Sequence, residues 1–475
     1  MVIEYRRIDM GDPRPSYEDL LEVNRQQQQQ IDALRAEVDR LRAQLEQANR
    51  SSKRQAAPFR KGSPKPAPKR PGRKSGDQHG THGHRPEPPP QAVDEVIDAP
   101  LPESCPHCDA SITETHVAEQ FQTDVPRKPV VRRFDVHIGR CQRCSRRVQG
   151  RHELQTSDAL GAAASQVGPD AQAAVVTLNK EAGLSHIKIA DCFGTLFGID
   201  LTRGACSQIL TRAARRLEPA YQEILTATRD AEVLTVDETG WRVGGESAWL
   251  HVWVGERATC YAIDRQRSAS ALEEVIGIDW DGVMVHDGWA SYDRFTDAIH
   301  QQCVAHILRR AREMLEVAVG GAVRFPGQVI EIFTGAIHLR NEYLAGRVSE
   351  GEWESARNRY ENRLLPILLV PRARADYQRL SDHLSNHFES WFGFLTDAEL
   401  EATNWRAEQA IRPAVVNRKV WGGNRTWAGA RAQGVLCSVL RTCHLQRVAK
   451  VDFISRSLRA FGNPTLPRPV LLATR

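Results

Sequence analysis

The strongest constraint on the fold is a set of strand-like segments, two of which end in aspartate. Strand-like patterns occupy residues 233–237, 248–254, 258–263 and 282–288, and a helix-like pattern occupies residues 268–276. Three consecutive strands, a helix and a fourth strand predict an α/β fold with a mixed sheet of the ribonuclease-H-like type. In that topology the first and fourth strands are neighbours, so Asp237 and Asp287 are expected in one site.

A third acid is predicted in a helix downstream. Asn404, Glu408 and Arg412 are spaced four residues apart, which puts an amide, a carboxylate and a guanidinium on one helical face. The segment from about 306 to 400 is helical in pattern and is predicted to be an insertion that covers the site. The whole catalytic domain is expected to span residues 229–450.

Three carboxylates suit hard divalent cations, because such ions prefer oxygen ligands. We expect Asp237, Asp287 and Glu408 to hold two Mg²⁺ ions, or Mn²⁺ in their place, for hydrolysis and transesterification of phosphodiesters. An aspartate at a strand end is often only a turn or helix-capping residue, so each acid alone is a weak signal. Other acids compete for the assignment: Glu238, Asp279, Asp281 and Glu401. Of these, Glu238 is expected to point to the opposite face of its strand from Asp237.

Positive charge is concentrated near the N-terminus. The whole chain has a net charge of +5. The segment from Ser51 to Ser75 alone contains nine Lys and Arg residues and no acidic residue. Residues 51–92, rich in Lys, Arg, Pro and Gly, are predicted to form a disordered basic arm that contacts DNA, although a solvated linker is the alternative. The candidate DNA contacts in this arm are Lys69, Arg70, Arg73 and Lys74.

A heptad pattern precedes the arm, within residues 15–50. Its apolar positions are Leu20, Ile31, Leu34, Val38, Leu41 and Leu45, with the polar Asn24 on the same seam. This pattern predicts a parallel coiled-coil zipper and hence a homo-oligomer; one amphipathic helix packed on the chain is the alternative.

Four cysteines form two C-x2-C pairs within residues 93–153, at Cys105, Cys108, Cys141 and Cys144. Each pair can present two thiolates on a tight turn, and β-like runs at 117–125 and 130–138 lie between the pairs. We expect a zinc ribbon with a structural Zn²⁺, because four sulfur ligands leave no position for water. The alternative is four buried cysteines without metal.

Residues 160–228 are predicted to be helical. A helix at 187–197, a turn around Gly198 and a helix from Leu201 to Leu210 resemble a helix-turn-helix, with an ordinary helical hairpin as the alternative. Arg203 could then reach base edges. Further DNA contacts are predicted at Asn404, Arg412, Arg418, Lys419 and Arg425.

The remaining features are less informative. No signal-peptide-like segment occurs, and the longest apolar run, residues 364–370, is too short to span a bilayer, so a cytoplasmic, nucleoid-associated protein without a membrane partner is expected. Cys303 and His306 could suggest a second zinc half-site, but no matching pair is found, which favours packing or a phosphate contact. Residues 451–475 are expected to be a C-terminal tail.

Taken together, these motifs resemble the transposases of the insertion sequence 66 family over nearly the whole chain. The marks of the resemblance are the zipper, the arm around Pro71–Lys74, the cysteine pairs, and the segments 236–241, 286–292, 303–306 and 404–429. The resemblance implies a DDE transposase with a ribonuclease-H-like core, a triad of Asp237, Asp287 and Glu408, and recognition of the inverted repeats of its own element. Accessory proteins of the same element are possible partners.

Two other functions remain compatible with the sequence. A catalytically silent, transposase-derived regulator would use only the DNA-binding segments, and an intact triad argues against it. A nuclease that cleaves without joining would use the same metal site, so the sequence does not separate cleavage from strand transfer.

Overall fold

The structure is a computed structural model, and its description covers part of the chain. The described residues are 25–34, 37–38, 87–98, 100–103, 107, 109–111, 118–122, 129–152, 154–155, 159–160, 166–463 and 466–472. The chain divides into two compact units, Met1–Thr123 and Asp124–Arg475, and each is described by itself. The boundary falls inside the segment predicted to be a zinc ribbon.

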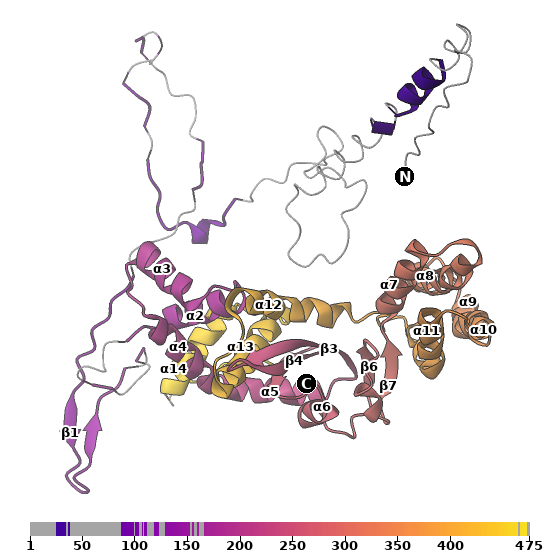
Figure 1. The fold of residues 1–475 in the computed structure, drawn as a ribbon. Helices are drawn as coiled ribbons and strands as arrows, with labels where there is room; N and C mark the ends of the chain where they lie inside the picture. The colour runs from indigo at the N-terminus through magenta and orange to yellow at the C-terminus, as the bar shows by residue number, and fades with distance from the viewer. Residues whose placement is uncertain are drawn as a thin grey trace, which may run out of the picture. The chain divides into compact units, whose positions relative to one another are not determined.

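A five-stranded mixed sheet forms the centre of the second unit (Figure 1). Its strands are β3 (Val233–Val243), β4 (Glu246–Val254), β5 (Thr259–Asp264), β6 (Val283–His286) and β7 (Ile299–Gln302). Their order is β5-β4-β3-β6-β7: β3, β4 and β5 are antiparallel neighbours, whereas β6 and β7 run parallel to β3. Thr235 pairs with Val285, so the first and fourth strands of the sheet are neighbours as predicted.

Two features of the sheet differ from the expectation. β3 continues past Asp237 to Val243, because Gly244 and Gly245 adopt positive φ and make the tight turn into β4. The fifth strand, β7, was not predicted, because its sequence Ile-His-Gln-Gln has no apolar alternation. Gln301 and Gln302 are nevertheless buried there.

Helices cover both faces of the sheet. One face packs on a large core built from α2 (Pro169–Lys180), α3 (His186–Phe197), α4 (Arg203–Arg216), α5 (Glu218–Arg229), α6 (Ala269–Ile276), α13 (Trp427–Leu445) and α14 (Lys450–Gly462). The other face packs on α12 (Trp405–Trp421), whose Ala407 and Ala410 share a core with Leu250 and Val252 of β4. The mixed α/β fold class is therefore confirmed.

The predicted insertion is helical, and it has a hydrophobic core of its own. Its helices are α7 (Val304–Glu316), α8 (Arg324–Leu344), α9 (Glu350–Glu354), α10 (Ala356–Leu368) and α11 (Ala375–Asn386). They follow β7 directly and lead back to α12 (Figure 1). Short 3₁₀ helices occupy Pro90–Ala92, Tyr292–Arg294, Gly320–Val323, Phe388–Ser390 and Gly393–Leu395.

The helix, turn and helix predicted around Gly198 are present. Ser185 caps α3, Gly198 ends it in the left-handed conformation, and Thr202 caps α4. Arg203, the first residue of α4, is exposed. Because α2, α4 and α5 share one core with the sheet, this helical region packs as part of the same domain as the sheet.

The C-terminal residues 451–475 were predicted to be a tail, and this was wrong for α14. Phe453, Ile454 and Leu458 of α14 are buried in the main core, where the helix packs against α2. The apolar residues of this helix are spaced three and four apart, which the prediction overlooked. None of the described helices has the length and apolar character needed to cross a membrane.

A small hairpin carries the second cysteine pair. β1 (Ile138–Arg140) and β2 (Arg147–Gln149) are antiparallel, with Arg140 opposite Arg147. The strand expected at residues 130–138 is instead three residues long and begins only at Ile138. Cys141 and Cys144 lie in the turn between β1 and β2.

In the first unit, residues 25–34 are helical, and Ile31 and Leu34 of the predicted seam are exposed, Leu34 by 66%. Lys69, Arg70, Arg73 and Lys74 of the basic arm, together with Cys105 and Cys108, lie outside the described residues.

Candidate active site

Asp237 lies in the middle of β3, on the face of the sheet that α12 covers. Its cross-strand partner is Val252, which packs with α12. The backbone N–H of Glu238 donates to its Oδ1 at 2.9 Å. Burial is the largest cause of a raised pKa at Asp237, the negative charges of Glu238, Asp287 and Glu408 add to it, and together they bring this pKa to about 8.

Asp287 follows β6 directly, at the point where the chain leaves the sheet. The backbone N–H of Trp289 donates to its Oδ1 at 3.1 Å, which orients the carboxylate. Gly288 makes the turn with a φ of 85°. A Cβ at this position would approach the Gln302 side chain to 2.6 Å and His383 to 2.9 Å, so only glycine fits.

Glu408 lies in the first turn of α12, and its side chain is 42% exposed. The Nε2 atom of His306, from α7, lies 3.7 Å from its Oε1 atom. Burial lowers the pKa of His306, whereas the charges of Asp287 and Glu408 act in the opposite direction. His306 therefore lies within electrostatic range of two of the three acids.

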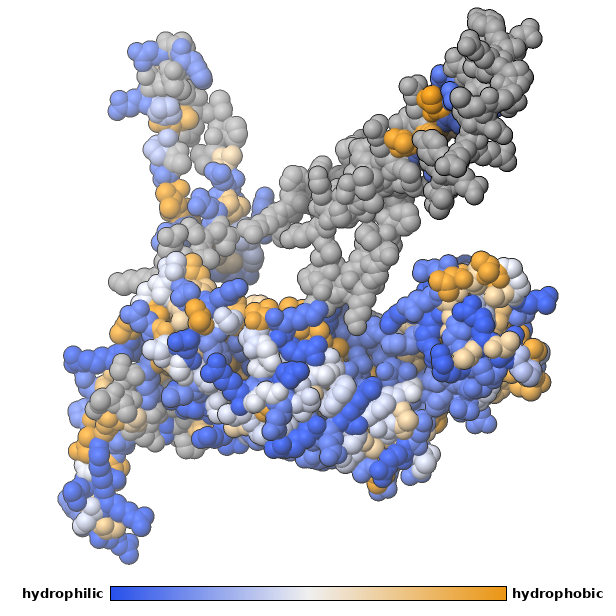
Figure 2. All heavy atoms as spheres, in the orientation of Figure 1, coloured by the Kyte–Doolittle hydropathy of each residue, from blue (hydrophilic) through white to orange (hydrophobic). Residues whose placement is uncertain are grey.

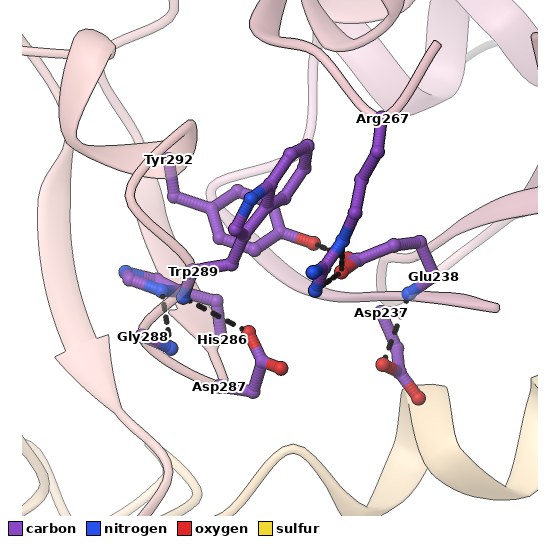
Figure 3. Close-up of polar contacts among 8 residues, drawn as sticks. All are labelled: Asp237, Glu238, Arg267, His286, Asp287, Gly288, Trp289 and Tyr292. Atoms are coloured by element: carbon purple, nitrogen blue, oxygen red, sulfur yellow. Dashed lines mark hydrogen bonds and ion pairs between the residues drawn. The ribbon is translucent and has the colours of Figure 1, made fainter. Parts of the chain in front are cut away.

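The three acids thus come from β3, the end of β6 and α12, and their charges act on one another. In Figure 3 the Asp237 and Asp287 carboxylates lie on neighbouring segments with no other labelled side chain between them. Within the described residues, however, no three acidic, histidine or cysteine side chains converge closely enough to form a ready metal shell.

Glu238 faces the opposite side of β3 and has a different environment. Its side chain is only 1% exposed and forms an ion pair with Arg267, whose Nε donates at 2.9 Å. Tyr292 donates its hydroxyl to the other carboxylate oxygen at 2.5 Å (Figure 3). Burial raises the pKa of Glu238, while the bonds from Tyr292 and Arg267 oppose that shift. Arg267 also stacks on Trp249 and Trp289, with 5.0 and 4.5 Å to the ring centroids.

The structure corrects the position of Asn404. Sequence spacing put it on an exposed helical face with Glu408 and Arg412, but it is the residue before α12 and is completely buried, at 0% exposure. Its backbone N–H donates to Cys303 Sγ at 3.3 Å. The segment joining the insertion to α12 packs against Cys303, so the Asn404 side chain is not available to DNA in this structure.

The other predicted DNA contacts that the structure describes lie at or near the surface. Arg412, Lys419 and Arg425 are exposed, and Arg418 is half-buried. Arg418 extends along β3, because a Cβ on Gly240 would lie 3.5 Å from its guanidinium. Surface hydropathy over the second unit is mixed, with polar residues predominating in this view (Figure 2).

The turn from Cys141 to Cys144 has the local form of a cysteine knuckle. Ser145 N–H donates to the Cys141 carbonyl at 2.8 Å, and Cys141 N–H donates to the Arg146 carbonyl at 2.9 Å. Hydrogen bonds from the backbone N–H groups of Cys144 and Arg143 lower the pKa of Cys141, which favours its thiolate.

Several residues around the acids were not assigned from the sequence. His306 was expected to serve packing or a phosphate contact, Tyr292 appeared only within the segment 286–292, and Arg267 was not singled out. Arg267 follows a strand by three residues and Tyr292 follows Asp287 by five, so proximity along the chain to a predicted acid was the available signal.

A family model described as the transposase family IS66 matches residues 164–432, which is more than half of the chain. The match includes all three acids, the helix-turn-helix-like segment and the insertion. A comparison with curated proteins gives no match. The family match, over a span that contains the whole sheet and the helix α12, shows that the chain belongs to the IS66 family of transposases.

Proposed function

We propose that this transposase binds the terminal inverted repeats of its element and cleaves and joins DNA strands with Asp237, Asp287 and Glu408. The observation that carries the proposal is the position of Asp237 on the α12-covered face of β3, beside the strand β6 that leads into Asp287; the charges of Asp287 and Glu408 both act on it. Asp237 and Asp287 are 50 positions apart in the sequence, and Asp287 and Glu408 are 121 positions apart, yet the charges of Asp287 and Glu408 both act on Asp237. Carboxylates are gathered against their mutual repulsion at sites that bind cations or move protons.

The strand order supports the same assignment. Three antiparallel strands followed by two parallel ones, with β3 and β6 adjacent, correspond to the ribonuclease-H-like topology expected from the sequence. The adjacency puts an acid from each strand on neighbouring segments. α12 then adds Glu408 from the covering layer.

The donor chemistry of the three acids fits a hard divalent cation. All three offer carboxylate oxygens, and Asp237 is held partly buried beside like charges, an arrangement that a cation relieves. Asp237, Asp287 and Glu408 would hold Mg²⁺, two ions in the proposed mechanism, or Mn²⁺. Bound ions of this kind supply a nucleophile at neutral pH and stabilise the leaving oxygen.

The chain's own residues set the geometry for this chemistry. The Trp289 N–H orients Asp287, and the Glu238 N–H orients Asp237. Because the pKa of Asp237 is raised, this carboxyl must release its proton before it can act as a ligand.

DNA binding is assigned to basic residues on two parts of the catalytic unit. Arg203 at the start of α4 would approach base edges, whereas Arg412, Arg418, Lys419 and Arg425 would contact phosphates beside α12. The basic arm would add contacts, and the heptad segment would join copies of the chain. Accessory proteins of the same element remain possible partners.

A structural zinc site is a separate part of the proposal, with Cys105, Cys108, Cys141 and Cys144 as ligands. The knuckle-like turn at Cys141 and Cys144 supports one half of it. Purified protein is expected to contain about one zinc per chain, measured by mass spectrometry of the metal, and Cys141→Ser should lose it. Cys443→Ser, at a buried cysteine of α13, is the matched control and should keep it. Equal zinc in all three proteins would contradict the site.

The main experiment compares two acids at opposite ends of β6. Asp287→Ala is expected to bind end-containing DNA normally but to lose cleavage in Mg²⁺, because it removes one proposed ligand. Asp281→Ala, at an exposed acid two residues before β6, should cleave like the wild type. Sequencing the products of a reaction with DNA carrying the element's ends would identify both cleavage and strand transfer.

Each result separates the proposal from its rivals. Cleavage retained by Asp287→Ala contradicts the triad. Cleavage without joined products favours a nuclease, and binding without cleavage under any divalent ion favours a DNA-binding regulator.

A further inference from the structure

Two residues at the start of α7, its N-cap residue Cys303 and His306 in its first turn, are not used by the proposed triad. Cys303 is buried and precedes α7 as its N-cap residue. Its backbone N–H donates to the carbonyl of His286 at 2.7 Å, and His286 is the residue immediately before Asp287. One side of Cys303 is therefore fixed to the strand end that carries the second acid.

The other side of Cys303 is fixed to the start of α12. Its Sγ accepts the backbone N–H of Asn404 at 3.3 Å, and the next residue, Val304, donates its N–H to the Ala402 carbonyl at 3.0 Å. The Asn404 carbonyl in turn accepts the N–H of Glu408 at 3.0 Å. Cys303 thus connects the segment bearing the second acid with the helical turn bearing the third.

Sulfur suits this position better than a smaller acceptor. Both Cys303 and Asn404 are buried, so an alanine at 303 would leave the Asn404 N–H without its acceptor. A serine hydroxyl is held on a shorter bond than a thiol, so it would fall short of the same N–H unless the backbone moved. The turn that carries Glu408 would shift with either substitution.

His306 acts on Glu408 from the same segment. Its backbone N–H donates to the Cys303 carbonyl at 3.3 Å, which ties the histidine to the cysteine. Its Nε2 lies 3.7 Å from Glu408 Oε1, which is longer than a hydrogen bond but close enough to restrict the carboxylate. The Glu408 side chain is otherwise partly exposed, so this contact limits its choice of rotamer.

We propose that Cys303 and His306 are positioning residues that hold the Glu408 carboxylate in register with Asp287. This proposal rests on the proposed function of the three acids. A zinc half-site does not explain the pair as well, because no third potential ligand gathers with them in the part of the chain that the structure describes.

The test measures Mn²⁺ binding by electron paramagnetic resonance, on the full chain without DNA. Cys303→Ala and His306→Ala are each expected to raise the half-saturating Mn²⁺ concentration by about ten-fold, as residues that orient metal ligands commonly do. Two matched controls should stay within about two-fold of the wild type: Cys443→Ala at another buried cysteine, and His338→Ala on α8. His306→Gln, which keeps a polar side chain beside Glu408, should recover part of the loss.

A second arm separates positioning from general loss of packing. In a Glu408→Gln background, Cys303→Ala should have almost no further effect on Mn²⁺ binding, because its effect passes through Glu408. A residue that only supports the fold would weaken binding equally in both backgrounds. Thermal unfolding of each variant identifies any that fail to fold, in which case Cys303→Ser and His306→Ala carry the test.

The outcomes distinguish this proposal from the proposed function. If Glu408→Gln weakens Mn²⁺ binding but Cys303→Ala and His306→Ala do not, the positioning role is overturned while the three-acid site stands. If Glu408→Gln has no effect on Mn²⁺ binding, the assignment of the third acid fails, and the positioning role fails with it.

Discussion

Asp237 and Glu238 are consecutive acids on β3, yet the two faces of the sheet give them opposite surroundings. Glu238 is buried with an arginine and a tyrosine that neutralise and saturate its carboxylate. Asp237 is half-buried beside other acids, and its one hydrogen bond given by the structure comes from the adjacent backbone N–H. Compensated charge is typical of a structural role, whereas uncompensated charge is typical of a functional site.

The largest difference between the two residues is expected in DNA cleavage, when each acid is replaced by its amide. Asp237→Asn is expected to reduce DNA cleavage on the order of 10³-fold, because a lost ligand removes several kcal/mol of transition-state stabilisation. Glu238→Gln should retain cleavage within about ten-fold of the wild type, which corresponds to less than about 1.4 kcal/mol. Initial rates on end-containing DNA in Mg²⁺ measure both.

A reversal of that order would mean that Glu238, not Asp237, serves the chemistry. Binding of the same DNA, measured without Mg²⁺, controls for loss of the fold in either variant.

The sequence predicted the positions of these acids better than their surroundings. Strand alternation from Val233 located Asp237 and put Glu238 on the opposite face, and the order of strands located Asp287. The face of each residue on β3 follows from the alternation of side chains along a strand. The pairing of β3 with β6 follows from the order of strands and helix along the chain. The hydrophobic alternation of β3 and β4 carried most of this information.

Contacts between residues on either side of the insertion could not be predicted from the sequence pattern. Cys303 meets Asn404 across 101 positions, and nothing in the spacing of either residue indicates this contact. Asn404 was therefore assigned to an exposed face, although the fold buries it. β7 was missed for a related reason, because its buried Gln301 is stabilised by partners such as the Trp391 carbonyl, 90 positions away in the sequence.

The next prediction concerns the pH dependence of stability in the absence of divalent ions. Because the pKa of Asp237 is raised to about 8 from its ordinary value of 3.8, ionisation costs more in the folded chain than in the unfolded chain. The contribution of the protonated Asp237 carboxyl to the free energy of unfolding is therefore fully present below about pH 3.8 and is lost progressively as the pH rises toward 8. Asp237→Asn removes this loss.

Asp237→Asn should therefore be more stable than the wild type, and its advantage in the free energy of unfolding should grow by about 2 kcal/mol between pH 5 and pH 8, allowing for hydration of the site. Urea unfolding at both pH values, with a chelator present, measures the difference. Glu238→Gln is the matched control and should show a smaller increase, because the hydrogen bonds from Tyr292 and Arg267 oppose the rise in the pKa of Glu238. A gap between Asp237→Asn and the wild type that stays constant with pH would contradict the uncompensated carboxylate.

The smallest effect is expected on the compensated side of β3. Glu238→Gln replaces a buried carboxylate with a neutral amide of similar shape, so Arg267 loses its ion-pair partner while Tyr292 keeps an acceptor. Arg267 is itself 36% exposed, and water screens part of the loss. The free energy of unfolding at neutral pH should therefore fall by only about 1 kcal/mol.

Arg267→Gln should give a similar loss, and the double variant should lose less than the sum, because the two side chains interact directly. Additive losses in this cycle would show that Glu238 and Arg267 contribute separately, and the contrast with Asp237 would then rest on burial alone.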